Sequence, residues 1–209
     1  MTKGEAGSSK EGRGVRRRNG VRWWRMCQST GSSTRGRVPI RFVTYNIRNG
    51  RKGGLESGLR RIYQFNMDLG IFQDTKVTDR IYTRGLNGYS VVATDAPIRH
   101  RGGVAVFYRP ELHFAVEAVQ QFGPNVFRFQ LATGERRWYI VGCYIAPDKT
   151  STIESVGAAL KGRPQGARLL VAGYFNVKLS YPEGDRRGEY ITEELATEGL
   201  EYMSSNFFP

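Results

Sequence analysis

The chain has 209 residues, of which 39% are hydrophobic and 24% charged, a composition typical of one globular domain plus a tail. No apolar run reaches the roughly 18 residues that a membrane-spanning helix needs, and the polar, glycine-rich first residues lack the apolar core of a secretory signal. The formal net charge of +13 favours polyanionic partners such as nucleic acid.

Residues 1–37 are rich in Gly, Ser and Arg and show no apolar period, which predicts a disordered basic tail. The first 40 residues hold ten Lys and Arg against two Glu, so most of the net charge lies there. Trp23 and Trp24 stand between arginines, an arrangement that can stack on nucleic-acid bases. A chance aromatic cluster in a merely solvated tail is the alternative.

Residues 38–209 carry the periodic patterns of a folded domain. The predicted strands cover residues 40–45, 69–72, 89–94, 104–108, 113–119, 126–131, 137–144 and 168–172. The predicted helices cover residues 55–67, 153–160 and 189–200. A hairpin turn is expected at residues 132–135. This order predicts a mixed α/β domain with antiparallel strand pairs and with helices on one face of the sheet.

The chain has two cysteines, Cys27 and Cys143, which are too few for a disulfide framework. We therefore expect a reduced, intracellular protein, with the nucleus as one location to consider. His100 and His113 have no Cys or His partners at ligand spacing, so no zinc site is expected.

Polar residues recur where the predicted strands end, namely at Asn46, Asp74, Tyr144 and Asn176. Strand ends can converge on one rim of a stacked sheet, so these scattered positions can meet in space. Each also has an ordinary structural explanation: a turn asparagine, a loop or helix cap, a core tyrosine and an Asx-turn. The residue pattern alone leaves both interpretations open.

Five short segments occur in a fixed order: TYNIR at 44–48, FQDTK at 72–76, RGGVA at 101–105, YIAP at 144–147 and AGYFN at 172–176. Together they resemble the endonuclease/exonuclease/phosphatase family, and most closely the endonuclease domains of non-LTR (LINE-like) retrotransposons. The resemblance extends from about residue 40 to the end of the chain.

The resemblance implies a two-sheet α/β sandwich that hydrolyses phosphodiesters with Mg²⁺ or Mn²⁺ and nicks target DNA. A hard cation of this kind takes oxygen ligands and neutralises charge on the phosphate. By the same resemblance, Asn46 and Asp74 would lie on the metal side of the site. Tyr144 would face the phosphate, and Asn176 would be the catalytic asparagine of the Gly-Asp-Phe-Asn motif. DNA is the expected partner, and no membrane contact is expected.

The chain departs from the family pattern at three points. Asp74 replaces the usual glutamate and is one methylene shorter. Tyr174 replaces the aspartate of Gly-Asp-Phe-Asn, and a phenol with a pKa of about 10 is a poor base at neutral pH. No segment matches the family's C-terminal Ser-Asp-His motif. We therefore expect a domain whose C-terminal part is missing, which exposes an apolar sheet face, and whose catalysis is impaired.

Other functions remain open at the level of sequence. One is an inactive nucleic-acid-binding module, and another is a non-functional retroelement remnant. Sphingomyelinases and inositol-phosphate phosphatases have the same scaffold and similar metal chemistry, but the segments at 102–105 and 144–147 look more like the retrotransposon branch. No Walker A or dinucleotide fingerprint is present.

Overall fold

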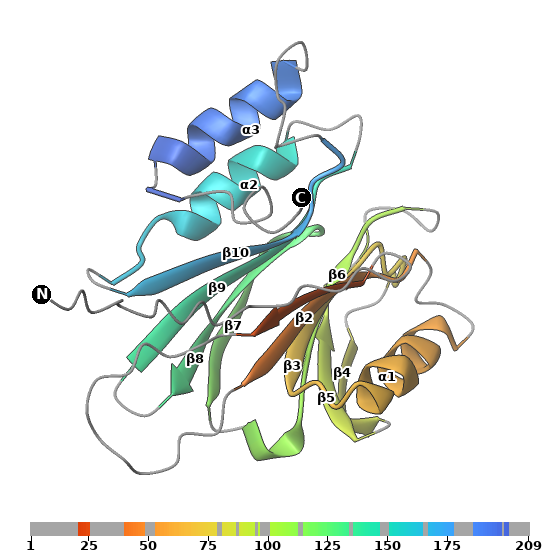
Figure 1. Ribbon diagram of the computed structural model, residues 1–209. Coiled ribbons are helices and arrows are strands. Elements are labelled where there is room, and N and C mark those ends of the chain that lie inside the picture. Colours follow the sequence, from red (N-terminus) through yellow and green to blue (C-terminus); the bar gives the residue numbers. More distant parts are fainter. Residues whose placement is uncertain are drawn as a thin grey trace, which may run out of the picture.

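The computed structural model describes residues 21–25, 40–48, 53–78, 81–86, 88–94, 96, 101–112, 115–133, 136–146, 151–164, 167–177, 186–197 and 199–200. These residues form two β-sheets packed face to face, with helices on their outer faces (Figure 1). No helix in this part of the chain is long and apolar enough to cross a membrane.

The first sheet has six strands in the order β1-β2-β3-β6-β5-β4. Their bounds are β1 Val21–Arg25, β2 Arg41–Asn46, β3 Leu69–Gln73, β4 Ile81–Leu86, β5 Tyr89–Ala93 and β6 Val104–Tyr108. Strands β2 and β3 run parallel, and Asn46 pairs with Gln73 at their carboxyl ends. The side chains that follow these two strands therefore lie at the same edge of the sheet.

The second sheet has four strands in the order β10-β9-β8-β7. Their bounds are β7 Val116–Gly123, β8 Val126–Thr133, β9 Arg136–Tyr144 and β10 Arg168–Tyr174, and a short 3-10 helix at Pro110–Leu112 precedes them. Strands β8 and β9 form the predicted hairpin, with Thr133 opposite Arg136. Strands β9 and β10 run parallel and end at the paired residues Tyr144 and Tyr174.

The main core lies between the two sheets. It is built from alternate residues of both sheets, among them Phe42, Ile71, Val106, Phe129 and Ile140, all of which are fully buried. This alternation follows the two-residue period of a strand, which sends every second side chain into the space between the sheets.

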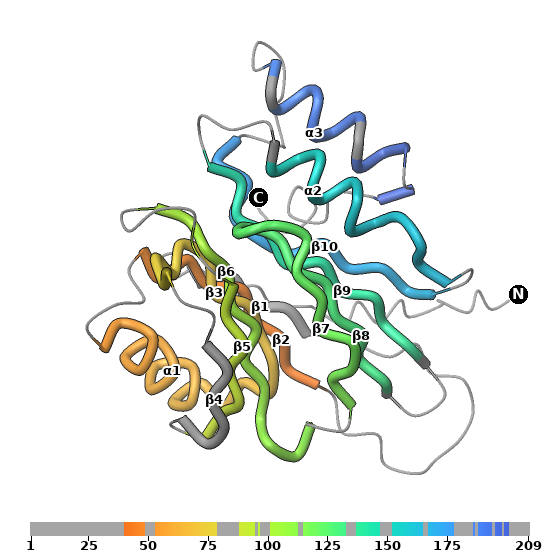
Figure 2. The backbone as a smooth tube through the Cα atoms, turned by 180° about the vertical axis from the view of Figure 1, so that it is seen from behind, coloured from red at the N-terminus to blue at the C-terminus, as the bar shows by residue number. Residues whose placement is uncertain are grey.

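Helices cover the outer faces of both sheets, as the two opposite views show (Figures 1 and 2). Helix α1 (Gly54–Gln64) packs on the first sheet, and helices α2 (Ser151–Leu160) and α3 (Arg186–Thr197) pack on the second. The sequence predicted helices on one face of the sheet, and each of the two sheets has its helices on one face only. Strand β3 is buried along its whole length, so its sheet has an apolar face toward the other sheet and a second one that a helix must cover.

Two strands formed where the sequence did not predict them. Strand β1 lies within the predicted disordered tail and pairs antiparallel with β2. Its residues Val-Arg-Trp-Trp-Arg favour extended backbone, and the edge of β2 offers unpaired backbone groups, so the tail prediction is corrected for these five residues. Strand β4 pairs with β5. The side chains of Trp23 and Trp24, together with the rest of residues 1–39, lie outside the described part.

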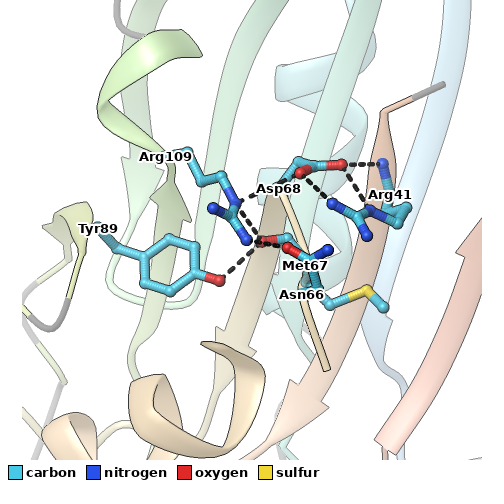
Figure 3. Close-up of polar contacts among 6 residues, drawn as sticks. All are labelled: Arg41, Asn66, Met67, Asp68, Tyr89 and Arg109. Atoms are coloured by element: carbon cyan, nitrogen blue, oxygen red, sulfur yellow. Dashed lines mark hydrogen bonds and ion pairs between the residues drawn. The ribbon is translucent and has the colours of Figure 1, made fainter. Parts of the chain in front are cut away.

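A charged cluster joins the starts of β2 and β3, at the end of the sheet opposite Asn46 (Figure 3). The Asp68 carboxylate accepts hydrogen bonds from the Arg41 backbone N–H at 2.8 Å and from the Arg41 guanidinium at 2.9 and 3.0 Å. Arg109 approaches the same carboxylate at 3.3 Å. Tyr89 and Arg109 both donate to the Met67 carbonyl. The cluster therefore holds β2, β3, β5 and β6 in register from their other end.

Candidate functional site

The carboxyl ends of two parallel strand pairs meet at one rim of the sandwich. β2 and β3 bring Asn46 and Asp74 there, and β9 and β10 bring Tyr144 and Asn176. The phenol of Tyr144 interacts electrostatically with Asp74 and hydrogen-bonds with Asn176. The structure therefore brings Asp74, Tyr144 and Asn176 together, and Asn46 ends the strand next to the one that precedes Asp74.

The carboxylate of Asp74 is held by the chain's own donors. Asp74 is 8% exposed and adopts a left-handed backbone with φ of 54°. Its Oδ1 accepts a hydrogen bond from the Gly102 N–H at 2.9 Å. Its Oδ2 lies 3.5 Å from the ammonium of Lys76. Both carboxylate oxygens are thus engaged within the loop.

The loop around Asp74 is paired with the Gly102-Gly103 segment. The Thr75 N–H donates to the Gly103 carbonyl at 3.2 Å, and the Lys76 N–H donates to the Gly102 carbonyl at 2.8 Å. Gly102 and Gly103 have φ of 92° and 83°, values that other residues rarely adopt. This pairing requires glycine at both positions, so the backbone conformation explains the two glycines of the RGGVA segment.

Asn125 links this loop to the second sheet and was not predicted as a site residue. It is 5% exposed, and its Oδ1 accepts a hydrogen bond from the Gly103 N–H at 2.8 Å. Its backbone carbonyl accepts one from the Tyr144 N–H at 2.9 Å. Gly123-Pro124-Asn125 is a turn signal in the sequence, but such a signal predicts only the hairpin between β7 and β8.

Tyr144 is a buried phenol with a raised pKa. Burial raises its pKa above the ordinary value of 10.0, and the negative charge of Asp74 raises it further. The hydrogen bond with Asn176 and the positive charge of Arg101 act in the opposite direction. Tyr144 therefore stays protonated at neutral pH, so it can donate a hydrogen bond but cannot serve as a base.

The two asparagines have local partners. The Asn46 Oδ1 accepts a hydrogen bond from the Arg48 N–H at 3.0 Å, which is an Asx-turn. The Asn176 Nδ2 donates to the Ile145 carbonyl at 2.8 Å and so ties β10 to β9. Asn46 thus has the turn contact that its sequence context allows, whereas Asn176 makes a longer-range contact. His100 and His113 lie outside the described residues.

These residues do not fit a tightly held divalent cation. Across the described ranges, no group of three or more His, Cys, Asp and Glu side chains is placed to bind a metal. Asp74 is engaged by Lys76 and Gly102, and the Asn46 oxygen is engaged by Arg48. Mg²⁺ prefers near-octahedral oxygen ligation with at least one or two carboxylates available to it. The nearby ammonium adds repulsion to this shortage of ligands.

The chain matches no family model, and no curated protein matches it in sequence. Its structure is similar to the endonuclease domain of TRAS1, a telomere-specific non-LTR retrotransposon, with a TM-score of 0.63 and 20% identity over 82% of this chain and 78% of that one. It is also similar to an AP endonuclease from Archaeoglobus fulgidus, with a TM-score of 0.55 and 17% identity over 75% of this chain and 69% of that one. The chain therefore has the two-sheet α/β sandwich fold that these two endonucleases share, which is the fold that the order of its motifs predicted.

Proposed function

We propose that the chain binds nucleic acid, with DNA as the expected form, at the rim that carries Asp74 and Tyr144, and that phosphodiester hydrolysis there is impaired. The nuclease-like fold supports nucleic acid as the class of ligand. One observation supports the impaired hydrolysis most directly: Gly102 and Lys76 already engage both carboxylate oxygens of Asp74.

Positive side chains at this rim support binding without a metal. Lys76 lies beside Asp74, Arg101 acts on the Tyr144 phenol, and Arg48 follows Asn46 in an exposed position. Lysine and arginine bind phosphates by direct charge pairing and release counterions from the polyanion. The affinity should therefore fall steeply with salt.

The identity of residue 174 is a second reason to expect impaired hydrolysis, because it is a tyrosine. By the family resemblance, this position would hold an aspartate. A phenol neither deprotonates water at neutral pH nor supplies a carboxylate's charge. A divalent cation, when bound, would supply charge neutralisation at the phosphate. The contacts of Asp74 and Asn46 oppose its binding, so we expect hydrolysis to be slow or absent.

A plasmid-nicking assay with Mg²⁺ and with Mn²⁺, run beside a salt titration of DNA binding, tests both halves of the proposal. We expect binding that weakens with salt and no metal-dependent nicking. Arg101→Ala should weaken binding, whereas Arg137→Ala removes the same charge at the far end of β9 and should change it little. Metal-dependent nicking that is abolished by Asn46→Ala would refute the impairment. Binding that is absent or insensitive to salt would refute the nucleic-acid assignment.

A further inference from the structure

Two tyrosines lie side by side at the rim. Tyr174 ends β10, Tyr144 ends β9, and the two residues are paired in the parallel register. Their rings are near-parallel, with an interplanar angle of 13° and centroids 6.3 Å apart. Tyr144 is 6% exposed, whereas Tyr174 is 39% exposed. One ring is therefore anchored in the core, and the other extends from it toward solvent.

The arrangement makes Tyr174 a supported, open aromatic surface. A centroid distance of 6.3 Å at this angle means that the rings are offset, because directly superposed rings would lie much closer. The offset leaves part of the Tyr174 ring uncovered by Tyr144. The buried ring limits the orientations of its neighbour, so a ligand that stacks on Tyr174 loses less side-chain entropy on binding.

The surroundings of this aromatic surface match a nucleotide. Tyr144, its supporting residue, lies within the electrostatic influence of Asp74, whose carboxylate is already engaged by Gly102 and Lys76, and of Arg101, a cation suited to a phosphate. A nucleotide presents a flat apolar base next to an anionic phosphate, and the rim presents an exposed aromatic ring whose neighbouring tyrosine lies near a cation.

We propose that Tyr174 stacks on an unpaired base of the bound nucleic acid, so that this rim selects single-stranded or unpaired segments over intact duplex. The inference rests on the proposed function and names its substrate class. Both faces of a base inside a duplex are covered by its neighbours, whereas an unpaired base can offer a face to Tyr174. Stacking of this kind tolerates any base, because every base has a π-face.

The test compares one oligonucleotide sequence as a single strand and as a duplex, each carrying 2-aminopurine, whose fluorescence is quenched on stacking. Tyr174→Ala should lower single-strand affinity by about 5- to 150-fold, the range expected for loss of one base–aromatic stack, and should abolish the quenching. Duplex affinity should change by less than about twofold. Tyr174→Phe keeps the ring and should retain both affinity and quenching.

Tyr190→Ala is the matched control, because Tyr190 is a similarly exposed tyrosine on α3. It should leave both affinities unchanged, and retained duplex binding by Tyr174→Ala would show that this variant is folded. Unchanged single-strand affinity in Tyr174→Ala, or an equal loss on both substrates, overturns the stacking assignment alone. Failure of the unmodified chain to bind either substrate overturns the proposed function and the stacking assignment with it.

Discussion

Asn125 and Gly103 are joined by a hydrogen bond between the two sheets: the Asn125 Oδ1 accepts from the Gly103 N–H at 2.8 Å. The Asn125 backbone carbonyl also accepts from the Tyr144 N–H. One buried residue therefore contacts the Gly102-Gly103 segment that holds Asp74 and the strand that ends at Tyr144. The relative position of the carboxylate and the phenol depends on this link.

Asn125→Ala should destabilise the fold. The substitution leaves the buried Gly103 N–H without its acceptor, which typically costs about 1–3 kcal/mol. Urea denaturation measures the change. Gln64→Ala, which removes an exposed amide at the end of α1, is the control and should change stability by less than about 0.5 kcal/mol. A loss for Asn125→Ala no larger than that of the control would contradict the linking role.

Gly103→Ala should destabilise more than Gly53→Ala. Both glycines have a positive φ, 83° and 78°, so both substitutions carry the backbone strain of about 1–2 kcal/mol. A Cβ at Gly103 would lie 2.4 Å from the Thr75 Oγ1, whereas a Cβ at Gly53 meets nothing within 4 Å. Overpacking should add about 1–3 kcal/mol at Gly103 only. Denaturation midpoints of the two variants measure the difference, and equal midpoints would show that Thr75 yields without cost.

Asp68→Asn should cost more stability than Glu117→Gln. Asp68 accepts paired bonds from Arg41 and lies close to Arg109, and its carboxylate is largely buried (Figure 3). Hydrogen bonds to charged groups contribute about 1.5–3 kcal/mol. Glu117 pairs with Arg137 at 3.6 Å on the open surface, where an ion pair contributes at most about 1 kcal/mol. Urea denaturation at low and high salt measures both variants, and similar losses would mean that solvent screens the Asp68 cluster.

The stability of the fold should fall as the pH rises from about 9 to about 12. Burial raises the pKa of Cys143 from 9.0 to about 12 and that of Tyr89 from 10.0 to about 12. Between the unfolded and folded values the unfolded chain has released protons that the folded chain retains, so alkaline pH favours unfolding.

Denaturation at a series of pH values measures this decline in the unmodified chain and in two variants. Cys143→Ala should remove the part of the stability decline that begins near pH 9. Tyr89→Phe should reduce the part of the decline between pH 10 and 12. Tyr89→Phe also loses the bond to the Met67 carbonyl, so its stability should be lower at neutral pH as well. A variant whose decline is as steep as that of the unmodified chain would show that its thiol or phenol is accessible to water.

Lys76→Met should raise the affinity for Mn²⁺. The ammonium lies 3.5 Å from the Asp74 carboxylate and repels a second cation there. Two unit charges about 4 Å apart interact by roughly 1 kcal/mol in water, so removing Lys76 should strengthen Mn²⁺ binding by at least about fivefold. Electron paramagnetic resonance of the free ion measures the affinity, and Asp74→Asn in the same background should abolish the gain. Lys161→Met, at an exposed lysine after α2, is the control, and an equal effect there would assign the change to net charge alone.

The sequence alone determined most of the secondary structure and the kind of fold. The apolar periods place β3, β6, β9, β10 and α2 within about two residues of their observed bounds, because each pattern records which side chains of one element are buried. The ordered motifs predicted the two-sheet sandwich. They also mark positions where strands end, and these ends meet at one rim because parallel neighbours finish at the same edge.

Only the tertiary structure decided how the rim is built. The bonds from Gly102 to Asp74 and from Gly103 to Asn125 join residues 28 and 22 positions apart, and no local pattern encodes such pairings. The same holds for β1, whose strand depends on the open edge of β2, and for the second layer of helices. The contact of Lys76 with Asp74 and the stacking of Tyr174 on Tyr144 depend on backbone angles and strand register, which arise when the two sheets pack together.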